Sequence, residues 1–177
     1  MSGVINSYGA KSGVLGELGS SVTQTKTYIL DQDFNTSETT ITGWLENGNA
    51  MHKLASFGSG VTESSGVFTF NKKGIYLIHG NFLSKHEGAD TWTGVSLKFN
   101  GSATSNIISQ RWGGDPDGTI NSSYDFHHTL KITSATDNIR FSSFSLGTGS
   151  HIIGLGGWDN VGEMGTSVTF MRIRNNL

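Results

Sequence analysis

The sequence predicts an all-β domain, a ten-stranded antiparallel jelly-roll sandwich with an extended N-terminal arm. Short runs of β-branched and aromatic residues recur along the chain, separated by turn residues. The chain has 25 glycines and one proline, and the many glycines suit frequent turns between short strands. No window shows apolar residues at the 3.6-residue spacing of an amphipathic helix over three turns.

Residues 1–22 differ in composition from the remainder of the chain. Five glycines and five serines interrupt every candidate helix or strand in this segment. Such a segment is a disordered tail unless contacts with a partner offset its loss of conformational entropy. The apolar side chains that would supply these contacts are Val4, Ile5, Tyr8, Val14 and Leu15. We therefore expect an anchoring arm over 1–22 and a jelly-roll head domain over 23–177.

The first part of the head domain alternates short strands with polar turns. Strands are expected over 25–30, 39–44, 52–56, 67–70 and 75–84, with 52–56 the weakest. Phe68 and Phe70 share one face, because side chains alternate along a strand. Residues 71–74 form a turn, and the apolar run 75–84 is predicted to be the central strand.

The second part repeats this pattern. In 93–100 the side chains of Val95, Leu97 and Phe99 face one way, and those of Ser96 and Lys98 face the other. A hairpin turn follows at residues 100–101. Further strands are expected over 106–112, 123–132, 139–146 and 166–174, with an irregular, glycine-rich stretch over 150–165.

Composition argues against several classes of protein. The net charge is −2, and the longest basic run is Lys72-Lys73, whereas a nucleic-acid-binding protein normally carries a basic stripe. The chain has no cysteine for a disulfide or a thiolate metal site. It has no apolar run long enough for a membrane helix, and residues 1–22 lack the apolar centre of a signal peptide. No nucleophile, zinc-protease or phosphate-loop motif occurs, so we expect no enzyme and no cofactor.

Residues 66–78, GVFTFNKKGIYLI, resemble the hallmark of the complement component-one-q and tumour necrosis factor superfamily. In that superfamily an F-x-F strand leads through a turn into G-x-Y and further apolar residues, and Gly74 and Tyr76 match the G-x-Y. Residues 133–138 resemble the next characteristic turn, with Asp137 at its acidic position and Thr136 in place of the usual glycine. Residues 165–173 resemble the last strand, and the likeness covers roughly 24–175.

The resemblance implies a jelly roll that trimerises about a three-fold axis through aromatic and aliphatic faces. The residues that it assigns to the trimer interface or the core are Tyr76, Tyr124, Phe126, His128 and Phe170. The chain lacks a collagen-like Gly-x-x repeat and cysteines, which fits bacterial or viral relatives better than secreted animal ligands. Residues 6–16 also resemble the N-terminal arms of tailed-phage virion proteins.

Two kinds of candidate site remain. Asp115 and Asp117 resemble the start of a calcium loop, but the final glutamate is missing, so an ordinary turn is favoured over a metal site. The tryptophans Trp92, Trp112 and Trp158 lie in or beside predicted loops, where they either contact a ligand such as a sugar or plug the ends of the sandwich.

The adjacent His127 and His128 point to opposite faces of a strand and cannot bind one metal together. Three copies of one of them near a trimer axis could bind a metal or respond to pH, although a hydrogen-bonded strand histidine is the simpler interpretation.

These observations lead to the hypothesis of a homotrimeric virion protein of a tailed phage. The favoured role is a capsid decoration (cement) protein, attached by its arm to the major capsid protein or another virion protein and assembled in the host cytoplasm. One alternative is a tail-fibre or receptor-binding tip that contacts a host surface glycan. Another is a free lectin-like module that binds carbohydrate or protein.

Overall fold

The computed structural model describes residues 22–46, 56–86, 93–101, 105–113, 120–155 and 165–173. All regular elements within these ranges are strands, which confirms the all-β prediction. The strands are β1 (Val22–Leu30), β2 (Trp44–Glu46), β3 (Val61–Ser64), β4 (Val67–Phe70), β5 (Gly74–His86), β6 (Thr93–Phe99), β7 (Ile107–Gly113), β8 (Ile120–Ile132), β9 (Asn138–Phe144), β10 (His151–Ile152) and β11 (Ser167–Ile173). Within the same ranges, no helix has the length and apolar character needed to cross a membrane.

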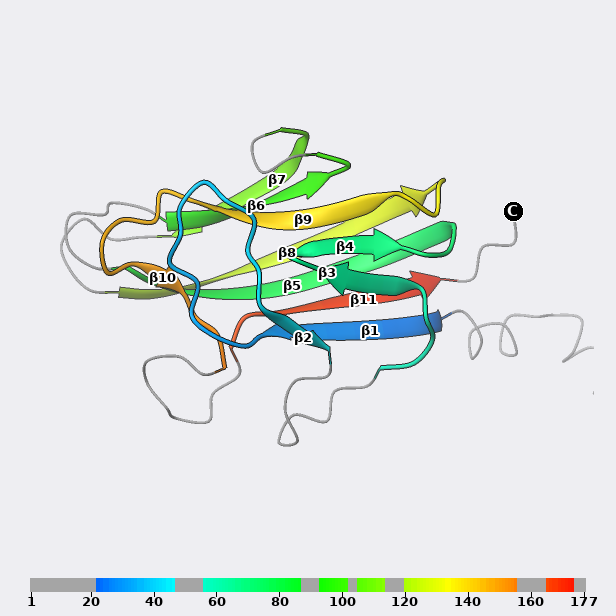
Figure 1. Ribbon diagram of the computed structural model, residues 1–177, viewed down its shortest axis with the longest axis horizontal. Helices are drawn as coiled ribbons and strands as arrows, with labels where there is room; N and C mark the ends of the chain where they lie inside the picture. Colours follow the sequence, from blue (N-terminus) through cyan, green and yellow to red (C-terminus); the bar gives the residue numbers. More distant parts are fainter. Residues whose placement is uncertain are drawn as a thin grey trace, which may run out of the picture.

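The strands form two antiparallel sheets, here named sheet A and sheet B. In sheet A, β5 pairs with β11, β11 with β1 and β1 with β2, while β8 and the short β10 also pair with β5. Sheet B has the order β3-β4-β9-β6-β7. Figure 1 shows the two sheets as stacked layers, with the segment after β1 rising from one layer to the other. This is the jelly-roll sandwich that the sequence predicts.

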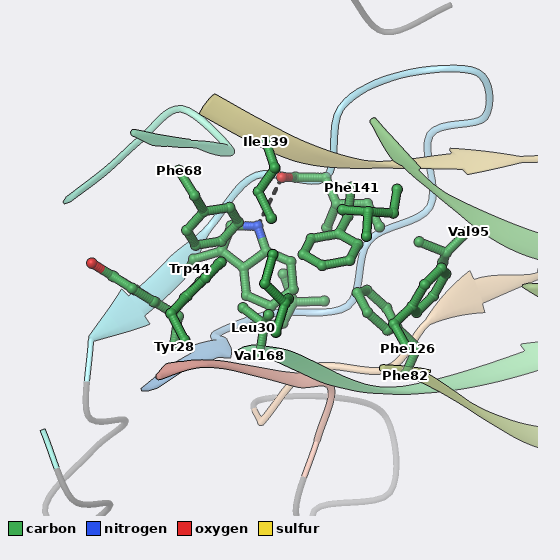
Figure 2. Close-up of a cluster of buried hydrophobic side chains, with 14 of the residues drawn as sticks. Tyr28, Leu30, Trp44, Phe68, Phe82, Val95, Phe126, Ile139, Phe141 and Val168 are labelled. Carbon is green, nitrogen blue, oxygen red and sulfur yellow. Dashed lines mark hydrogen bonds between the residues drawn. The ribbon is translucent and has the colours of Figure 1, made fainter. Parts of the chain in front are cut away.

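Aromatic side chains from both sheets fill the space between the layers. The ring of Phe68 on β4 lies 5.1 Å from the ring of Tyr28 on β1 and 5.1 Å from that of Phe170 on β11. Farther along the sandwich, the rings of Phe82 on β5 and Phe141 on β9 lie 4.8 Å apart. Figure 2 shows these rings packed with aliphatic side chains such as Leu30, Ile139 and Val168. Buried aromatic side chains of this size dominate the stability of a core.

The prediction of one continuous strand over 39–44 is wrong, because β2 begins only at Trp44. Residues 39–41 instead lie along the edge of β9, where the Ile41 amide donates to the Phe141 carbonyl at 2.9 Å. Gly43 then turns the chain at a φ of 86°, and only at Trp44 does it enter β2. The Trp44 indole nitrogen donates to the Ile41 carbonyl at 2.8 Å and so fixes this bend (Figure 2).

The sequence analysis also missed β3, because its composition is polar and glycines lie near both of its ends. Pairing with β4 creates this strand: Val61 lies opposite Phe70 and Ser64 opposite Val67. The short β10 similarly falls in a stretch predicted to be irregular. Most of the strand predicted over 52–56 lies outside the described residues, and Ser56 is not in a strand.

The G-x-Y motif ties three parts of sheet A together. Gly74 has a φ of 147°, and a Cβ there would lie only 2.9 Å from the Arg172 Nε. The Arg172 guanidinium donates to the carbonyl of Lys73 in the preceding turn, with Nη2 at 2.8 Å. The Tyr76 hydroxyl donates to the Lys72 carbonyl at 2.9 Å and accepts from the Gln24 amide on β1 at 2.7 Å. The motif therefore fixes the turn against β11 and β1.

Asp137 organises the turn between β8 and β9. Its Oδ2 accepts the backbone amides of Thr133 and Ser134, both at 2.9 Å, and its Oδ1 accepts from the Asn100 side chain at 2.9 Å. Burial by itself would raise the pKa of this carboxyl, but the hydrogen bonds from Asn100, Ser134 and Thr133 outweigh burial and lower the pKa. The acidic position of the turn is thus a structural anchor.

We expect Asp137→Asn to lower the free energy of unfolding at pH 7 by roughly 1–3 kcal/mol, because the amide cannot accept all three hydrogen bonds. A carboxyl with a depressed pKa stabilises the fold above its unfolded-state pKa and loses this effect as the pH falls through its folded-state pKa. The difference from wild type should therefore shrink on acidification toward pH about 3. Urea denaturation at several pH values measures it. Asp31→Asn is the matched control, because no hydrogen bond of the Asp31 carboxylate occurs within the described ranges.

Candidate interaction surfaces

Most residues that the sequence analysis assigned to the trimer interface or the core lie inside the sandwich. Tyr76, Phe126 and Phe170 are at most 1% exposed, and Tyr124 is 8% exposed. These four side chains belong to the buried cluster between the sheets. An interface with another molecule must therefore use other side chains.

The two adjacent histidines of β8 point to opposite faces, as predicted. The exposed His127 ring stacks on the ring of His79 from β5, with centroids 4.5 Å apart and planes inclined by 13°. The half-buried His128 lies opposite the core residue Ile78, and its Nε2 is buried without a hydrogen-bond partner. Burial, with smaller contributions from Arg111 and His127, lowers the pKa of His128.

The outward surface of sheet A carries the histidine pair beside a row of apolar side chains. Leu77 on β5 pairs with Met171 on β11, and both side chains are half-buried. His79 lies opposite His127 on β8 in the next row. A shallow depression of about 230 Å³ is lined by Leu77, Ile78, His79, His127, His128, Thr129 and Met171. We call the outward side chains Ile75, Leu77, His79, His127, Met171 and Ile173 the sheet A face.

Polar contacts fix one side of this face. The Asn81 amide donates to the Asp125 carboxylate at 3.0 Å, and the His79 Nε2 lies 3.9 Å from the same carboxylate oxygen. Because Asn81 and Asp125 lie on adjacent strands, their bond links β5 to β8 beside the histidine pair. The sheet A face is thus apolar at its centre with a polar border, which is the usual composition of a protein interface.

A second exposed apolar patch lies on the edge strand β7. Ile107 and Ile108 at its start are 47% and 41% exposed. We call this pair the β7 patch. Exposed apolar side chains on an edge strand favour pairing with another chain, so natural proteins usually cover or break such an edge. Near the other end of β7, Trp112 is 61% exposed, so this candidate ligand contact is accessible.

Arg111, between these two parts of β7, joins the edges of the sheets. Its Nε donates to the Asp125 carbonyl on β8 at 3.2 Å, and its guanidinium carbon lies 5.7 Å from the centroid of the Phe126 ring. This cation–π contact holds β7 beside β8. The β7 patch therefore has a defined position at the edge of the sandwich (Figure 1).

Other predicted site residues lie outside the described ranges. They are Val4, Ile5, Tyr8, Val14 and Leu15 of the arm, the tryptophans Trp92 and Trp158, and the candidate metal ligands Asp115 and Asp117. Within the described ranges, no group of three or more histidine or acidic side chains is placed to hold a metal ion.

The sequence analysis did not single out His79, Leu77 or Met171. A signal was present, because each lies at an outward position of a strand whose alternate residues are buried. In a sheet with one solvent-facing side such positions are usually polar. Apolar residues and histidine there indicate a surface that contacts something other than water.

Comparisons with known proteins support the fold. No protein-family model and no curated protein sequence matches this chain. A crystal structure of murine APRIL at pH 8.0 matches with a TM-score of 0.53 and 10% sequence identity, covering 84% of this chain and 98% of that chain. A structure of murine APRIL at pH 5.0 matches with a TM-score of 0.52 and 14% identity over the same shares of the two chains. This likeness shows a jelly-roll fold of the tumour necrosis factor type.

We expect the stability of the protein to fall as the pH drops below about 6.5, because the unfolded state then takes up a proton that folded His128 resists. Thermal denaturation between pH 7.5 and 5.5 should therefore show a smaller decrease in melting temperature for His128→Leu than for wild type. His79→Gln, at an exposed histidine, is the control. An unchanged pH dependence in H128L would contradict this assignment.

Proposed function

We propose that this chain is the subunit of a homotrimeric, non-enzymatic jelly-roll module. The observation that carries the proposal is the pair of different apolar surfaces, the half-buried sheet A face and the exposed β7 patch. Surfaces that differ from each other favour a heterologous contact, in which one patch of each subunit meets the other patch of its neighbour. Such contacts generate a closed ring when the rotation between subunits closes. The resemblance to the tumour necrosis factor superfamily supports three subunits in that ring.

In this arrangement the β7 patch of one subunit packs on the sheet A face of the next. Ile107 and Ile108 would lie against the depression beside Leu77 and Met171, removing apolar area of both subunits from water. The stacked histidines His79 and His127 would then lie within the contact, where their rings add flat, amphipathic area. The buried core residues keep both surfaces in place.

Single charge substitutions test this arrangement. We expect wild type to elute as a trimer at micromolar concentration in size-exclusion chromatography with light scattering. Met171→Glu, on the sheet A face, and Ile108→Glu, on the β7 patch, should each give monomers, because a charge would be buried without a partner. Ser64→Glu, at an exposed position of β3, should leave the trimer intact.

Mixing the two variants gives a sharper result. M171E keeps an intact β7 patch and I108E keeps an intact sheet A face, so an equal mixture should form one-to-one pairs although each variant alone is monomeric. Circular dichroism confirms that both variants are folded. A monomeric wild type, or variants that remain trimers, would contradict the proposal.

We propose further that the trimer decorates the capsid of a tailed phage and is held there by its N-terminal arm. Support comes from the sequence: the glycine- and serine-rich residues 1–22 carry spaced apolar side chains, and residues 6–16 resemble the arms of phage virion proteins. A trimer would present three such arms, and several weak attachments act together with far higher avidity than one. The proposed location is the virion, after assembly in the host cytoplasm.

Deletion of the arm tests this role. Val22 is the first residue of β1, so the deletion should end at residue 21. We expect the shortened protein to remain a folded trimer and to lose binding to phage particles stripped of the decoration protein, measured by co-sedimentation. A full-length variant with Val4, Ile5, Tyr8, Val14 and Leu15 replaced by serine is the matched control and should also lose binding. Undiminished binding by either protein would contradict the anchoring role.

The exposed side chain of Trp112 favours a second candidate function, recognition of a ligand by a receptor-binding tip or a lectin-like module. This function is compatible with the same trimer, because Trp112 is separate from the sheet A face. It differs from decoration in requiring a ligand site on the head domain.

A further inference from the structure

The outward side of sheet B arranges three strands into rows of different chemistry. Because Val95 and Leu97 point into the core, the alternate residues Gly94, Ser96 and Lys98 lie on the outward side of β6. Their partners on β9 are Phe144, Ser142 and Arg140, and their partners on β7 are Trp112, Gln110 and Ile107. An aromatic row, a hydroxyl and amide row and a cationic row therefore follow one another along the sheet.

The aromatic row is flat because its central residue is glycine. A Cβ on Gly94 would lie 2.3 Å from the Phe144 Cζ and 2.4 Å from the Arg111 carbonyl oxygen, so no larger residue fits beneath the Phe144 ring. Phe144 is 9% exposed, whereas Trp112 on the other side of Gly94 is 61% exposed. The accessible indole thus forms the end of the row, where its face can stack on a ligand.

The middle row supplies uncharged polar groups. The Gln110 amide donates to the Ser96 hydroxyl at 3.0 Å, which orients an exposed amide beside the indole. Ser142, fully buried, has a hydroxyl without a hydrogen-bond partner. Because Ser142 and Ser96 are buried, the exposed Gln110 amide is the group of this row that a ligand can reach.

The cationic row is the least expected part of this side. Lys98 is 4% exposed and lies directly opposite Arg140 on the neighbouring strand. Like charges in opposite positions repel, and the Arg140 Nε is buried without a hydrogen-bond partner. Burial is the main cause of a lowered pKa at Lys98, with Glu38 opposing it and Arg140 adding to it. Two neighbouring cations in this setting are stabilised by an anion.

We propose that this outward side of sheet B binds an oligosaccharide that carries carboxylate groups. The indole of Trp112 would stack on one sugar ring, Gln110 would bind hydroxyl groups, and Lys98 with Arg140 would bind the carboxylate. Gly94 and Lys98 are four residues apart on β6, roughly 13 Å, so the ligand must be longer than one sugar unit. A neutral sugar would bring no further anion to the two cations beside Glu38, and a small inorganic anion would not need the indole.

This inference deepens the second candidate function, recognition of a ligand by the head domain. Its four ligand-binding residues, Trp112, Gln110, Lys98 and Arg140, belong neither to the arm nor to the sheet A face or the β7 patch, although Ile107 of the β7 patch lies opposite Lys98. The full-length protein can therefore be tested directly. Immobilised oligosaccharides of three classes serve as probes: uronate- or sialate-bearing, sulfated, and neutral. Poly-glutamate and inorganic phosphate in solution serve as competitors that separate an acidic glycan from an acidic protein or a free anion.

We expect retention on the carboxylate-bearing class and at least about tenfold weaker binding to the neutral class. Trp112→Ala should weaken binding by about tenfold, because stacking is lost. Lys98→Met keeps the apolar stem, Arg140→Gln removes the second charge, and each should weaken binding by a similar factor and reduce its salt dependence. Phe57→Ala and Lys131→Met, at an exposed ring and an exposed cation elsewhere, are the matched controls and should bind as wild type does.

Three results would overturn the proposal. The first is retention on none of the three classes by a folded protein. The second is equal binding of neutral and carboxylate-bearing probes, which would remove the role of the cations. The third is displacement by poly-glutamate together with normal binding by W112A, which would favour an acidic protein instead. If the arm-deleted protein lost binding to phage particles but was still retained on the carboxylate-bearing oligosaccharide, this would support the glycan proposal, because the ligand site would lie on the head domain.

Discussion

The packing of aromatic rings around Phe68 is the constraint on which the remainder of the structure depends. This side chain from sheet B contacts rings from β1 and β11 of sheet A, and also those of Trp44 and Phe141. Interlocking rings fix both the separation of the sheets and their relative position, because a close-packed interior tolerates little displacement. The Tyr76 hydroxyl and the Asp137 carboxylate then hold the turns at the ends of the core strands.

The core also decides which side chains face outward. A slip of one residue in the register of β5 or β6 would place Leu77 or Ser96 in the core and expel Ile78 or Leu97. The buried rings oppose such a slip, so the sheet A face and the rows on sheet B follow directly from the inward pattern. The outward side chains are therefore available for binding, because other residues stabilise the fold.

Alternation within single strands was the part of the structure that the sequence could predict. The inward sides of β4 and β6 were identified from Phe68 and Phe70 and from Val95 and Leu97, all of which are buried. Errors arose where pairing between distant segments decides the structure, as for β3 and for residues 39–41 beside β9. The His79–His127 stack and the Lys98–Arg140 pair depend on cross-strand register, which no local pattern reveals.

The two outward sides of the sandwich differ in chemistry, and this difference separates their proposed roles. The sheet A face offers half-buried apolar side chains and two stacked histidine rings, a composition suited to contact with another folded surface. The outward side of sheet B offers an exposed indole, an oriented amide and two cations, which suit a flexible polar ligand. In the proposed ring Ile107 would lie in the contact between subunits, so the cationic row of sheet B would begin at the edge of that contact, whereas Trp112 lies at the other end of β7.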